Sequence, residues 1–275
     1  MHVAASTGGP NNSSRILTQG RDGIIKVWPT DRLLSGDRAT CAELRTGATG
    51  FCQFSVPQNR AGGSSVGPDT LLAPCSEQGH LQLWDLRTGS VGANIQVVPP
   101  DRGMVMCCKL LHTSAGQGDA SLAVAGREDG SVSVHDLRTL RTLCCTELYK
   151  DPVMCCDVTA DGRTGVIGSA GNAIHLWSLD IAVGKLESTA QFQLQTPGVA
   201  CVRFRQDSEL FAAGCWDSTV RLYRCRKPAP LAVLQQHEGS ANSVAFSPTA
   251  GSGSFAVGSK DTQISLWQMY GSAVT

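Results

Sequence analysis

Short apolar runs alternate with turn-forming residues along the whole chain, and one pattern of them recurs six times. Each copy places a turn residue ahead of alternating apolar positions and ends in an aromatic residue or a histidine. The copies read DGIIKVW at 22–28, QGHLQLW at 78–84, DGSVSVH at 129–135, GNAIHLW at 171–177, DSTVRLY at 217–223 and DTQISLW at 261–267. Alternation with period two predicts β-strands, and an Asp-Gly pair between two such runs predicts a hairpin turn.

The six copies end at residues 28, 84, 135, 177, 223 and 267, so they follow one another at intervals of 56, 51, 42, 46 and 44 residues. A strand-rich unit that returns about every 40–45 residues is typical of a WD40 β-propeller blade. The pattern therefore predicts an all-β, WD40-type β-propeller with six recognisable four-stranded blades. Because repeats bury their faces against their neighbours, we expect one domain over residues 1–275, with repeats near 1–46, 47–98, 99–148, 149–195, 196–236 and 237–275.

Two expectations concern particular strands. The second repeat is expected to start with an inner strand at 51–56, where FCQFSV alternates clearly. The sixth repeat has few residues after Trp267, and the first residues of the chain are short of apolar positions. We therefore expect an open or strained ring with an unpaired sheet edge beside Gln263–Gln268, and such an edge favours aggregation.

Charge and composition exclude several classes of partner. The 23 basic and 23 acidic residues balance, so there is no electrostatic reason to expect direct binding of nucleic acid or of an anionic membrane. No apolar run approaches the roughly 20 residues of a membrane helix, and the start of the chain lacks the basic and apolar regions of a secretory signal. No phosphate-binding glycine loop or zinc-protease motif occurs. We expect no enzyme activity, no cofactor, no metal and no small-molecule substrate.

The twelve cysteines need a separate explanation, because three pairs are adjacent, at 107–108, 144–145 and 155–156. Neighbours on a strand point to opposite faces, so such a pair does not chelate one metal easily. No C-x-x-C spacing is present. In a reducing compartment a free cysteine serves as a small buried apolar residue, and we expect that role here.

The sixth repeat combines a histidine, a hydroxyl residue, a turn aspartate and the strand tryptophan. We expect a structural hydrogen-bonded network among His237, Ser259, Asp261 and Trp267, which is stabilising when every member is satisfied. The same residue types could suggest a catalytic triad, but no G-x-S-x-G elbow occurs, and the aspartate belongs to a repeated turn. The structural interpretation is therefore favoured.

The repeats resemble the WD40 family across the chain, and several stretches are more specific. GSAGNAIHLWSLD, TPGVACVRF, GCWDSTVRLY, PLAVLQQHEGSANSVAFSP and GSKDTQISLW, together with LTQGRDGIIKVW and AGREDGSVSVHDLRT, resemble the branch of guanine nucleotide-binding beta-like and ASTRA-associated proteins. The resemblance implies a non-enzymatic interaction scaffold of nucleus and cytoplasm. It also implies links to the ASTRA assembly, chromatin regulation and the co-chaperoning of PI3-kinase-like kinases. Members of that branch carry a further N-terminal blade, so the resemblance implies that one blade of a seven-bladed ring is lacking here.

Two other functions remain open. Trp84, Asp85 and Arg87 form a W-D-x-R sequence that is similar to the box with which substrate receptors of cullin ubiquitin ligases contact their adaptor. Ordinary blades also carry this sequence often, so the motif alone decides little. A heterotrimeric G-protein beta subunit is less favoured, because no heptad pattern for a gamma subunit is present.

Trp216 is the candidate binding residue. Four of the five tryptophans end the repeated strand, whereas Trp216 precedes Asp217 in the turn before it. Most residues at the same place in other repeats are charged, and in WD40 relatives this place lies on the face where partners dock. Tryptophan is enriched among interface hot spots. We expect Trp216 to contact partners, with Arg21, Glu128 and Lys260 as its charged surround, or else to fold over its own blade and stabilise the turn.

Overall fold

The computed structural model describes residues 2–6, 14–36, 39–57, 69–77, 79–97, 102–113, 120–225, 227, 229–249 and 252–269. These residues form 22 β-strands and one five-residue helix, so the expected all-β class is confirmed. The helix is not long enough to cross a membrane, and no other helix occurs among the described residues. The chain divides into two compact units, one of residues 1–128 with 132–145 and one of residues 129–131 with 146–275. The expectation of a single domain stays a prediction.

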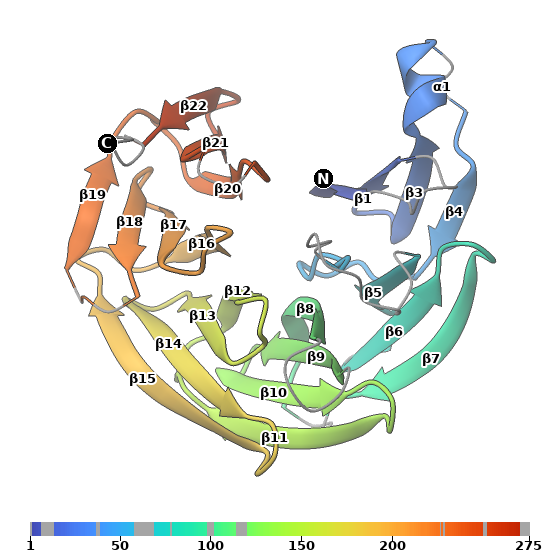
Figure 1. The fold of residues 1–275 in the computed structure, drawn as a ribbon, viewed down its shortest axis with the longest axis horizontal. Helices are drawn as coiled ribbons and strands as arrows, with labels where there is room; N and C mark the ends of the chain where they lie inside the picture. The colour runs from blue at the N-terminus through green and yellow to red at the C-terminus, as the bar shows by residue number, and fades with distance from the viewer. Residues whose placement is uncertain are drawn as a thin grey trace. The chain divides into compact units, whose positions relative to one another are not determined.

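The first unit holds three antiparallel sheets, except for a few residues of the third, and Figure 1 draws them from blue to green. We number the sheets in chain order. The first sheet is β1 (His2–Ser6), β2 (Arg15–Gln19), β3 (Ile24–Pro29) and β4 (Ala42–Arg45), with α1 (Thr30–Leu34) after β3; the second is β5 (Thr70–Pro74), β6 (His80–Asp85) and β7 (Ser90–Gln96); the third is β8 (Val105–Thr113), β9 (Ala120–Arg127), β10 (Ser131–Asp136) and β11 (Arg141–Glu147).

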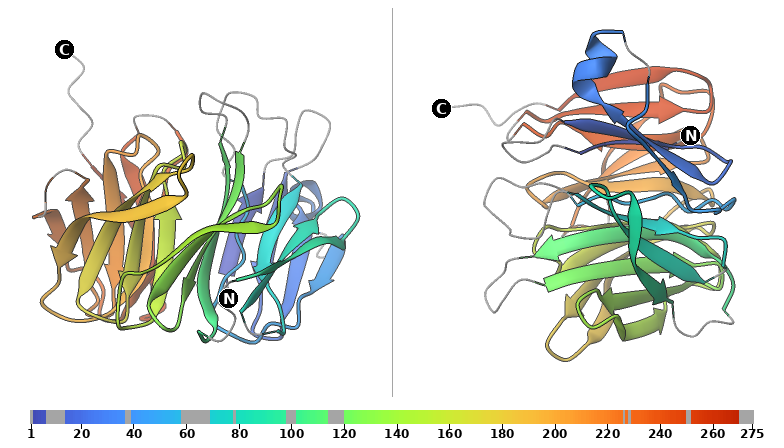
Figure 2. Two further views of the ribbon diagram at one scale, coloured as in Figure 1. Left: turned by 90° about the horizontal axis from the view of Figure 1, so that it is seen from below. Right: turned by 90° about the vertical axis from the view of Figure 1, so that its right-hand side faces the viewer.

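The second unit also holds three antiparallel sheets, drawn from yellow to red in Figure 1, and Figure 2 shows their twist from two further sides. The fourth sheet is β12 (Val153–Val158), β13 (Thr164–Ser169), β14 (Ala173–Asp180) and β15 (Lys185–Gln193); the fifth is β16 (Val199–Phe204), β17 (Leu210–Cys215), β18 (Val220–Arg224) and β19 (Pro230–Leu234); the sixth is β20 (Ala241–Phe246), β21 (Ser254–Ser259) and β22 (Ile264–Gln268). Six sheets match the six predicted repeats.

The repeated aspartate makes the same turn in four sheets. Its Oδ1 accepts a hydrogen bond from the N–H two residues further on: the N–H of Thr219 donates to Asp217 at 3.2 Å, and the N–H of Gln263 donates to Asp261 at 2.9 Å. Asp22 and Asp129 do the same. This local bond supports a left-handed residue in the turn, including Ser218 with φ of 66°. Local side-chain chemistry therefore starts each of these central hairpins.

The predicted inner strand at 51–56 is wrong as a full strand. Among the described residues it contributes one isolated bridge, between Ser55 and Leu72, so the second sheet has three strands. The segment's other polar groups bond to neighbouring sheets instead. Gln19 donates to the carbonyl of Cys52 and accepts the N–H of Phe54, at 3.1 and 2.9 Å. Its alternation reflects this packing between sheets rather than a continuous ladder.

A small thiol or hydroxyl residue stands opposite a glycine near the start of the inner strand in four sheets. The pairs are Cys107 with Gly126, Cys155 with Gly168, Cys201 with Gly214 and Ser243 with Gly258. Each follows a register shift at the start of its strand. Seven cysteines, these three among them, are buried, and the glycines leave room for the small side chains. Repeated packing at these positions explains part of the cysteine content.

Candidate interaction surface

Five residues in the turns of the second unit are joined end to end by hydrogen bonds. The N–H of Gly198 donates to the carbonyl of Gly171 at 2.9 Å, and the N–H of Trp216 donates to the carbonyl of Gly198 at 3.0 Å. The Ser240 hydroxyl donates to the carbonyl of Trp216 at 3.2 Å. The N–H of Lys260 donates to the backbone carbonyl of Ser240 at 2.9 Å. These residues form what we call the turn surface, and the bonds hold it rigid across three sheets.

Trp216 is the large apolar side chain of the turn surface. Its indole lies over the backbone of Gly198, because a Cβ added at Gly198 would sit only 2.1 Å from a ring carbon. Gly198 has φ of 102°, which favours glycine in any case. Even so, 44% of Trp216 remains exposed. The ring therefore rests on its own sheet and still presents a broad apolar surface to solvent.

The predicted charged surround is divided between the two units. Lys260 is exposed and belongs to the turn surface with Trp216. Arg21 and Glu128 are exposed turn residues of the first unit, and Glu128 accepts the N–H of Met104 at 3.2 Å. The structure brings Trp216 and Lys260 into one surface, while a role for Arg21 and Glu128 beside them stays a prediction.

The hairpin of the fifth sheet that follows Trp216 carries an ion pair that the sequence pattern did not single out. Arg221 Nη2 lies 2.7 Å from Asp217 Oδ2, and Arg221 is only 9% exposed. The Thr219 hydroxyl donates to the other carboxylate oxygen at 2.6 Å. The four-residue spacing of Asp217 and Arg221 across the hairpin turn is the signal that could have revealed it. The pair fixes the turn that carries Trp216.

The network of the sixth sheet forms, with one further member. His237 Nδ1 lies 2.9 Å from Asp261 Oδ2, and His237 Nε2 lies 2.8 Å from the hydroxyl of Ser265, which also accepts the Trp267 indole N–H at 2.8 Å. Ser265 is therefore the hydroxyl that links His237 to Trp267, while Ser259 belongs to the network through Asp261, whose backbone N–H donates to Ser259 Oγ at 3.2 Å. Ser265 and Trp267 are two residues apart on β22 and share a face, whereas Ser259 lies at the turn end of β21 and donates to a backbone carbonyl.

The electrostatics of this network suit a structural role. Desolvation acts to raise the pKa of Asp261, but hydrogen bonds from the N–H groups of Gln263 and Glu238 and from the side chains of His237 and Ser259 outweigh it and hold the pKa well below its ordinary value. The Ser265 hydroxyl is engaged by both His237 and Trp267, and His237 is 7% exposed. The groups satisfy one another, as a packed network requires.

Other sheets replace the network with different chemistry at the same place. In the first sheet the Trp28 indole donates to the Thr18 hydroxyl at 2.9 Å. In the third sheet His135 takes the aromatic position and lies 2.9 Å from Ser133 Oγ and 3.1 Å from Thr142 Oγ1. Burial, and after it the charge of Arg127, lowers the pKa of His135 to about 4. The histidine in the DGSVSVH copy was the available signal for this second buried network.

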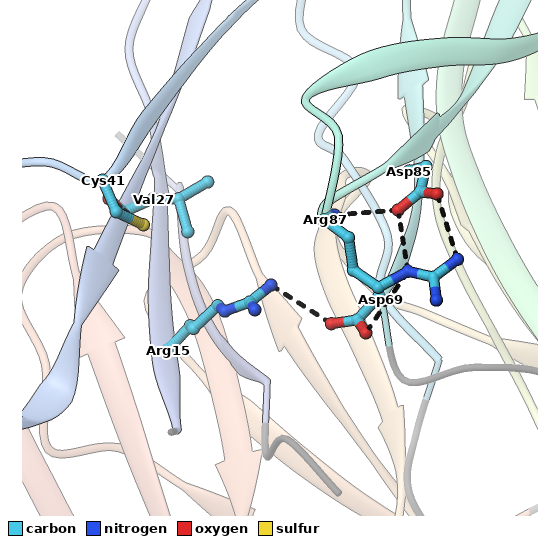
Figure 3. A network of polar contacts seen from close by, with 6 residues as sticks. All are labelled: Arg15, Val27, Cys41, Asp69, Asp85 and Arg87. Carbon is cyan, nitrogen blue, oxygen red and sulfur yellow. Dashed lines mark hydrogen bonds and ion pairs between the residues drawn. The ribbon is translucent and has the colours of Figure 1, made fainter. Parts of the chain in front are cut away.

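The W-D-x-R sequence has a structural role in the second sheet. Trp84 is 7% exposed and packs in the core. The backbone N–H of Arg87 donates to Asp85 Oδ1 at 2.8 Å, and the Arg87 guanidinium also reaches Asp85. Arg87 Nε lies 3.9 Å from Asp69 Oδ2, and Arg15 Nη1 lies 3.1 Å from Asp69 Oδ1 (Figure 3). Asp85 therefore closes a hairpin turn, and the Arg87 side chain stays 69% exposed.

The same turn recurs without the full motif. Asp136 accepts the N–H of Arg138 at 2.8 Å, and Asp180 accepts the N–H of Ala182 at 3.0 Å. The aspartate position is thus explained by the turn between the last two strands of a blade. The described residues contain no group of three or more His, Cys, Asp or Glu side chains placed to hold a metal.

Comparison with known proteins identifies the repeats. The family model "WD domain, G-beta repeat" matches residues 186–224 and 228–268. The mouse guanine nucleotide-binding protein subunit beta-like protein 1 is 30% identical over 257 residues, which cover 93% of this chain and 74% of that protein. The chain belongs to the WD40 family of beta-like proteins. ASTRA-associated protein 1 of Verticillium alfalfae is 26% identical, over 94% of this chain and 78% of that protein.

The two matched WD40 repeats correspond to successive groups of four strands. The first runs from β15 through β18 and contains Trp216, and the second runs from β19 through β22 and contains the His237 network. A WD40 repeat thus spans the outer strand of one sheet and three strands of the next. All residues of the turn surface except Gly171 lie within the two ranges that the family model matches.

Proposed function

We propose that the protein is a non-enzymatic scaffold of an ASTRA-type assembly, acting in nucleus and cytoplasm. By this proposal it takes part in chromatin regulation and in the co-chaperoned maturation of PI3-kinase-like kinases. The observation that carries the proposal is the similarity, along most of the chain, to relatives named ASTRA-associated protein 1 and beta-like protein 1. WD40 proteins usually act by binding other proteins, and the rigid turn surface suits that use.

Within this proposal, partner proteins bind the turn surface and Trp216 is their central contact. The support is the combination of a half-exposed indole with a backbone held on both sides by hydrogen bonds. A side chain that is already ordered loses little conformational entropy when a partner covers it, which favours binding. Lys260 adds a positive charge to the same surface.

Affinity purification with quantitative mass spectrometry tests the proposal. The bait is the full chain, compared with Trp216→Ala and with the control Val183→Ala, which removes an exposed apolar side chain from a different turn of the same unit. We expect kinase-maturation or chromatin-linked proteins with the parent chain and the control. Trp216→Ala should lose at least about 2 kcal/mol of binding, roughly a 30-fold weaker affinity, with little change in melting temperature.

Two outcomes would contradict these statements. Recovery of a cullin-ligase adaptor, lost in Arg87→Ala, would favour the substrate-receptor alternative, for which the exposed Arg87 is the one supporting observation. A Trp216→Ala variant that melts earlier but still binds its partners when folded would make Trp216 a structural residue. In that case the scaffold role would stand and the binding site would lie elsewhere.

A further inference from the structure

The fourth sheet departs from the repeat at the turn between β13 and β14. Where the first, third, fifth and sixth sheets have the turn aspartate, this sheet has Gly171, which carries no side chain. A carboxylate from a different loop occupies the space. Asp151 lies in the loop before β12, and its Oδ2 is 2.4 Å from the point where a Cβ added at Gly171 would lie. The fourth sheet therefore carries an acidic group at this turn, but from another part of the chain.

The carboxylate of Asp151 takes no part in holding the turn. The N–H of Gly171 donates to the hydroxyl of Ser169 at 3.1 Å instead. Asp151 is exposed, and within the described part of the chain no hydrogen bond or ion pair reaches its carboxylate, not even from Lys150 beside it in sequence. Its charge is therefore available to a ligand.

Asp151 and Trp216 pack on two glycines that are bonded to each other. The N–H of Gly198 donates to the carbonyl of Gly171 at 2.9 Å, which keeps the two Cα atoms within about 7 Å. The carboxylate lies against Gly171, and the indole lies against Gly198. A side chain at either glycine would displace the group that packs there. The glycines thus bring an acidic group and an apolar ring together at one end of the turn surface.

A carboxylate close to a half-exposed indole is a combination that binds cations. The electrons of the ring attract a guanidinium or ammonium group, and the apolar stem of arginine or lysine packs on the same ring. The carboxylate adds charge-assisted hydrogen bonds. Arginine suits the pair better than lysine, because its planar guanidinium stacks on a ring and can donate two parallel N–H bonds to a carboxylate. The phosphates of a nucleic acid would be repelled by Asp151.

The other charges of the turn surface leave the cation site at this end. Asp217, which follows Trp216, is neutralised by Arg221, whose Nη2 lies 2.7 Å from its carboxylate. Lys260 stands at the opposite end of the turn surface, with Ser240 between it and Trp216 in the series of hydrogen bonds. The negative charge that a ligand can use therefore lies on the Gly171 side of the indole.

We propose that Asp151 and Trp216 together bind an arginine side chain of a partner protein. The guanidinium pairs with the carboxylate, while the plane and the apolar stem of the arginine lie on the indole. This inference rests on the proposed scaffold function, because it names the chemistry that the turn surface recognises. The partner is thus a protein segment that presents a basic side chain, rather than an acidic segment or a nucleic acid.

A double-mutant cycle between the full chain and a peptide tests the assignment. The full chain selects binders from a randomised peptide display library, and a selected peptide is synthesised with its arginine and with glutamine in the same place. Fluorescence anisotropy gives the affinity of both peptides for the parent chain and for Asp151→Asn, which keeps the size of the side chain. Either change alone should weaken binding about tenfold, as expected for hydrogen bonds to a charged group. Both changes together should weaken it no further, because they remove the same interaction.

The control variant is Glu209→Gln, which removes an exposed acidic charge from the hairpin at the other end of the fifth sheet. It should leave both affinities unchanged. Asp151→Lys should reverse the preference, so that a peptide with glutamate in place of the arginine binds better than the original. Trp216→Ala should weaken the arginine and the glutamine peptides alike, since the stem of either side chain packs on the indole.

Additive losses in the cycle would overturn the assignment, and so would selection of peptides that lack arginine or of no peptide at all. Partner capture from cells that Trp216→Ala removes and Asp151→Lys does not would overturn it as well, while leaving the scaffold function in place. If the parent chain captures no partner protein from cells, the proposed function is contradicted. The peptide cycle needs no cellular partner, so it still decides whether Asp151 and Trp216 bind arginine.

Discussion

The fifth and sixth sheets carry nearly the same strand pattern 44 residues apart, yet the same apolar positions are buried in the fifth sheet and exposed in the sixth. Leu222 and Leu266 stand at equivalent places on β18 and β22, and they are 3% and 83% exposed. The difference is not in the residues but in the neighbour, because the sixth sheet covers the fifth. In a repeat array each face is stabilised by the next unit, so burial is a property of the pair.

The largest expected difference comes from truncating these two leucines. Leu222→Ala should destabilise the protein by about 2–5 kcal/mol, since it removes buried methyl groups and leaves a cavity. Leu266→Ala should change stability by no more than about 0.5 kcal/mol, because its side chain is already in water. Urea unfolding of the two variants measures this. Equal losses would mean that Leu266 is buried in solution, either by this chain or by a bound partner.

The comparison extends to the aromatic position, where the third sheet has His135 and the sixth has Trp267. His135 is held neutral, with a pKa of about 4 beside an ordinary value of about 6.5. The contribution of neutral His135 to the free energy of unfolding is therefore fully present above pH 6.5. It decreases as the pH drops from 6.5 toward 4, by up to about 3 kcal/mol. Unfolding followed at several pH values should show this slope, and His135→Phe should flatten it. An unchanged slope in the variant would assign the effect to other groups.

Gly214, which pairs with Cys201, and Gly258, which pairs with Ser243, should differ less in the stability that a substitution costs. An added methyl group at Gly214 would collide with the backbone of Ala241 and with Cys201, so Gly214→Ala should cost about 1–3 kcal/mol. At Gly258 the collision is only with the Ser243 hydroxyl, which can rotate, and Gly258→Ala should cost less. Thermal unfolding of the two variants measures which substitution costs more stability. A larger loss at Gly258 would show that its face is already covered.

The smallest effect concerns the sixth sheet's network. Asp261→Ala removes the acceptor of three hydrogen bonds, and we expect a melting temperature lower by about 2–4 °C. Because the pKa of Asp261 is depressed, its contribution is present above the ordinary carboxyl value of about 4 and is lost as the pH falls below it. The difference between parent and variant should therefore begin to narrow below pH 4 without closing at pH 3, because the depressed pKa keeps the folded-state carboxylate ionised there, as scanning calorimetry at pH 7 and pH 3 would record. A difference that is as large at pH 3 as at pH 7 would point to packing rather than to the charge.

Local chemistry made much of the fold predictable. The turn aspartates, the alternating strands and the spacing of about 44 residues depend on neighbours in sequence, and six sheets appear where six repeats were expected. Among the described strands β22 pairs only with β21, while the expected open or strained ring stays a prediction. The exposed place of Trp216 could be read from its position in the repeat, since the turn is defined by Asp217.

Long-range contacts decided what the pattern left open. The inner strand at 51–56 became a single bridge because Gln19 of another sheet takes its hydrogen bonds, and Ser265 joined the network beside Ser259 because of the face that it shares with Trp267. The sequence by itself determined where strands and turns lie, since backbone and side-chain bonds over a few residues set them. Only the tertiary structure decided which hydroxyl meets His237 and that Leu222 is buried while Leu266 is not, because both depend on what the next sheet supplies.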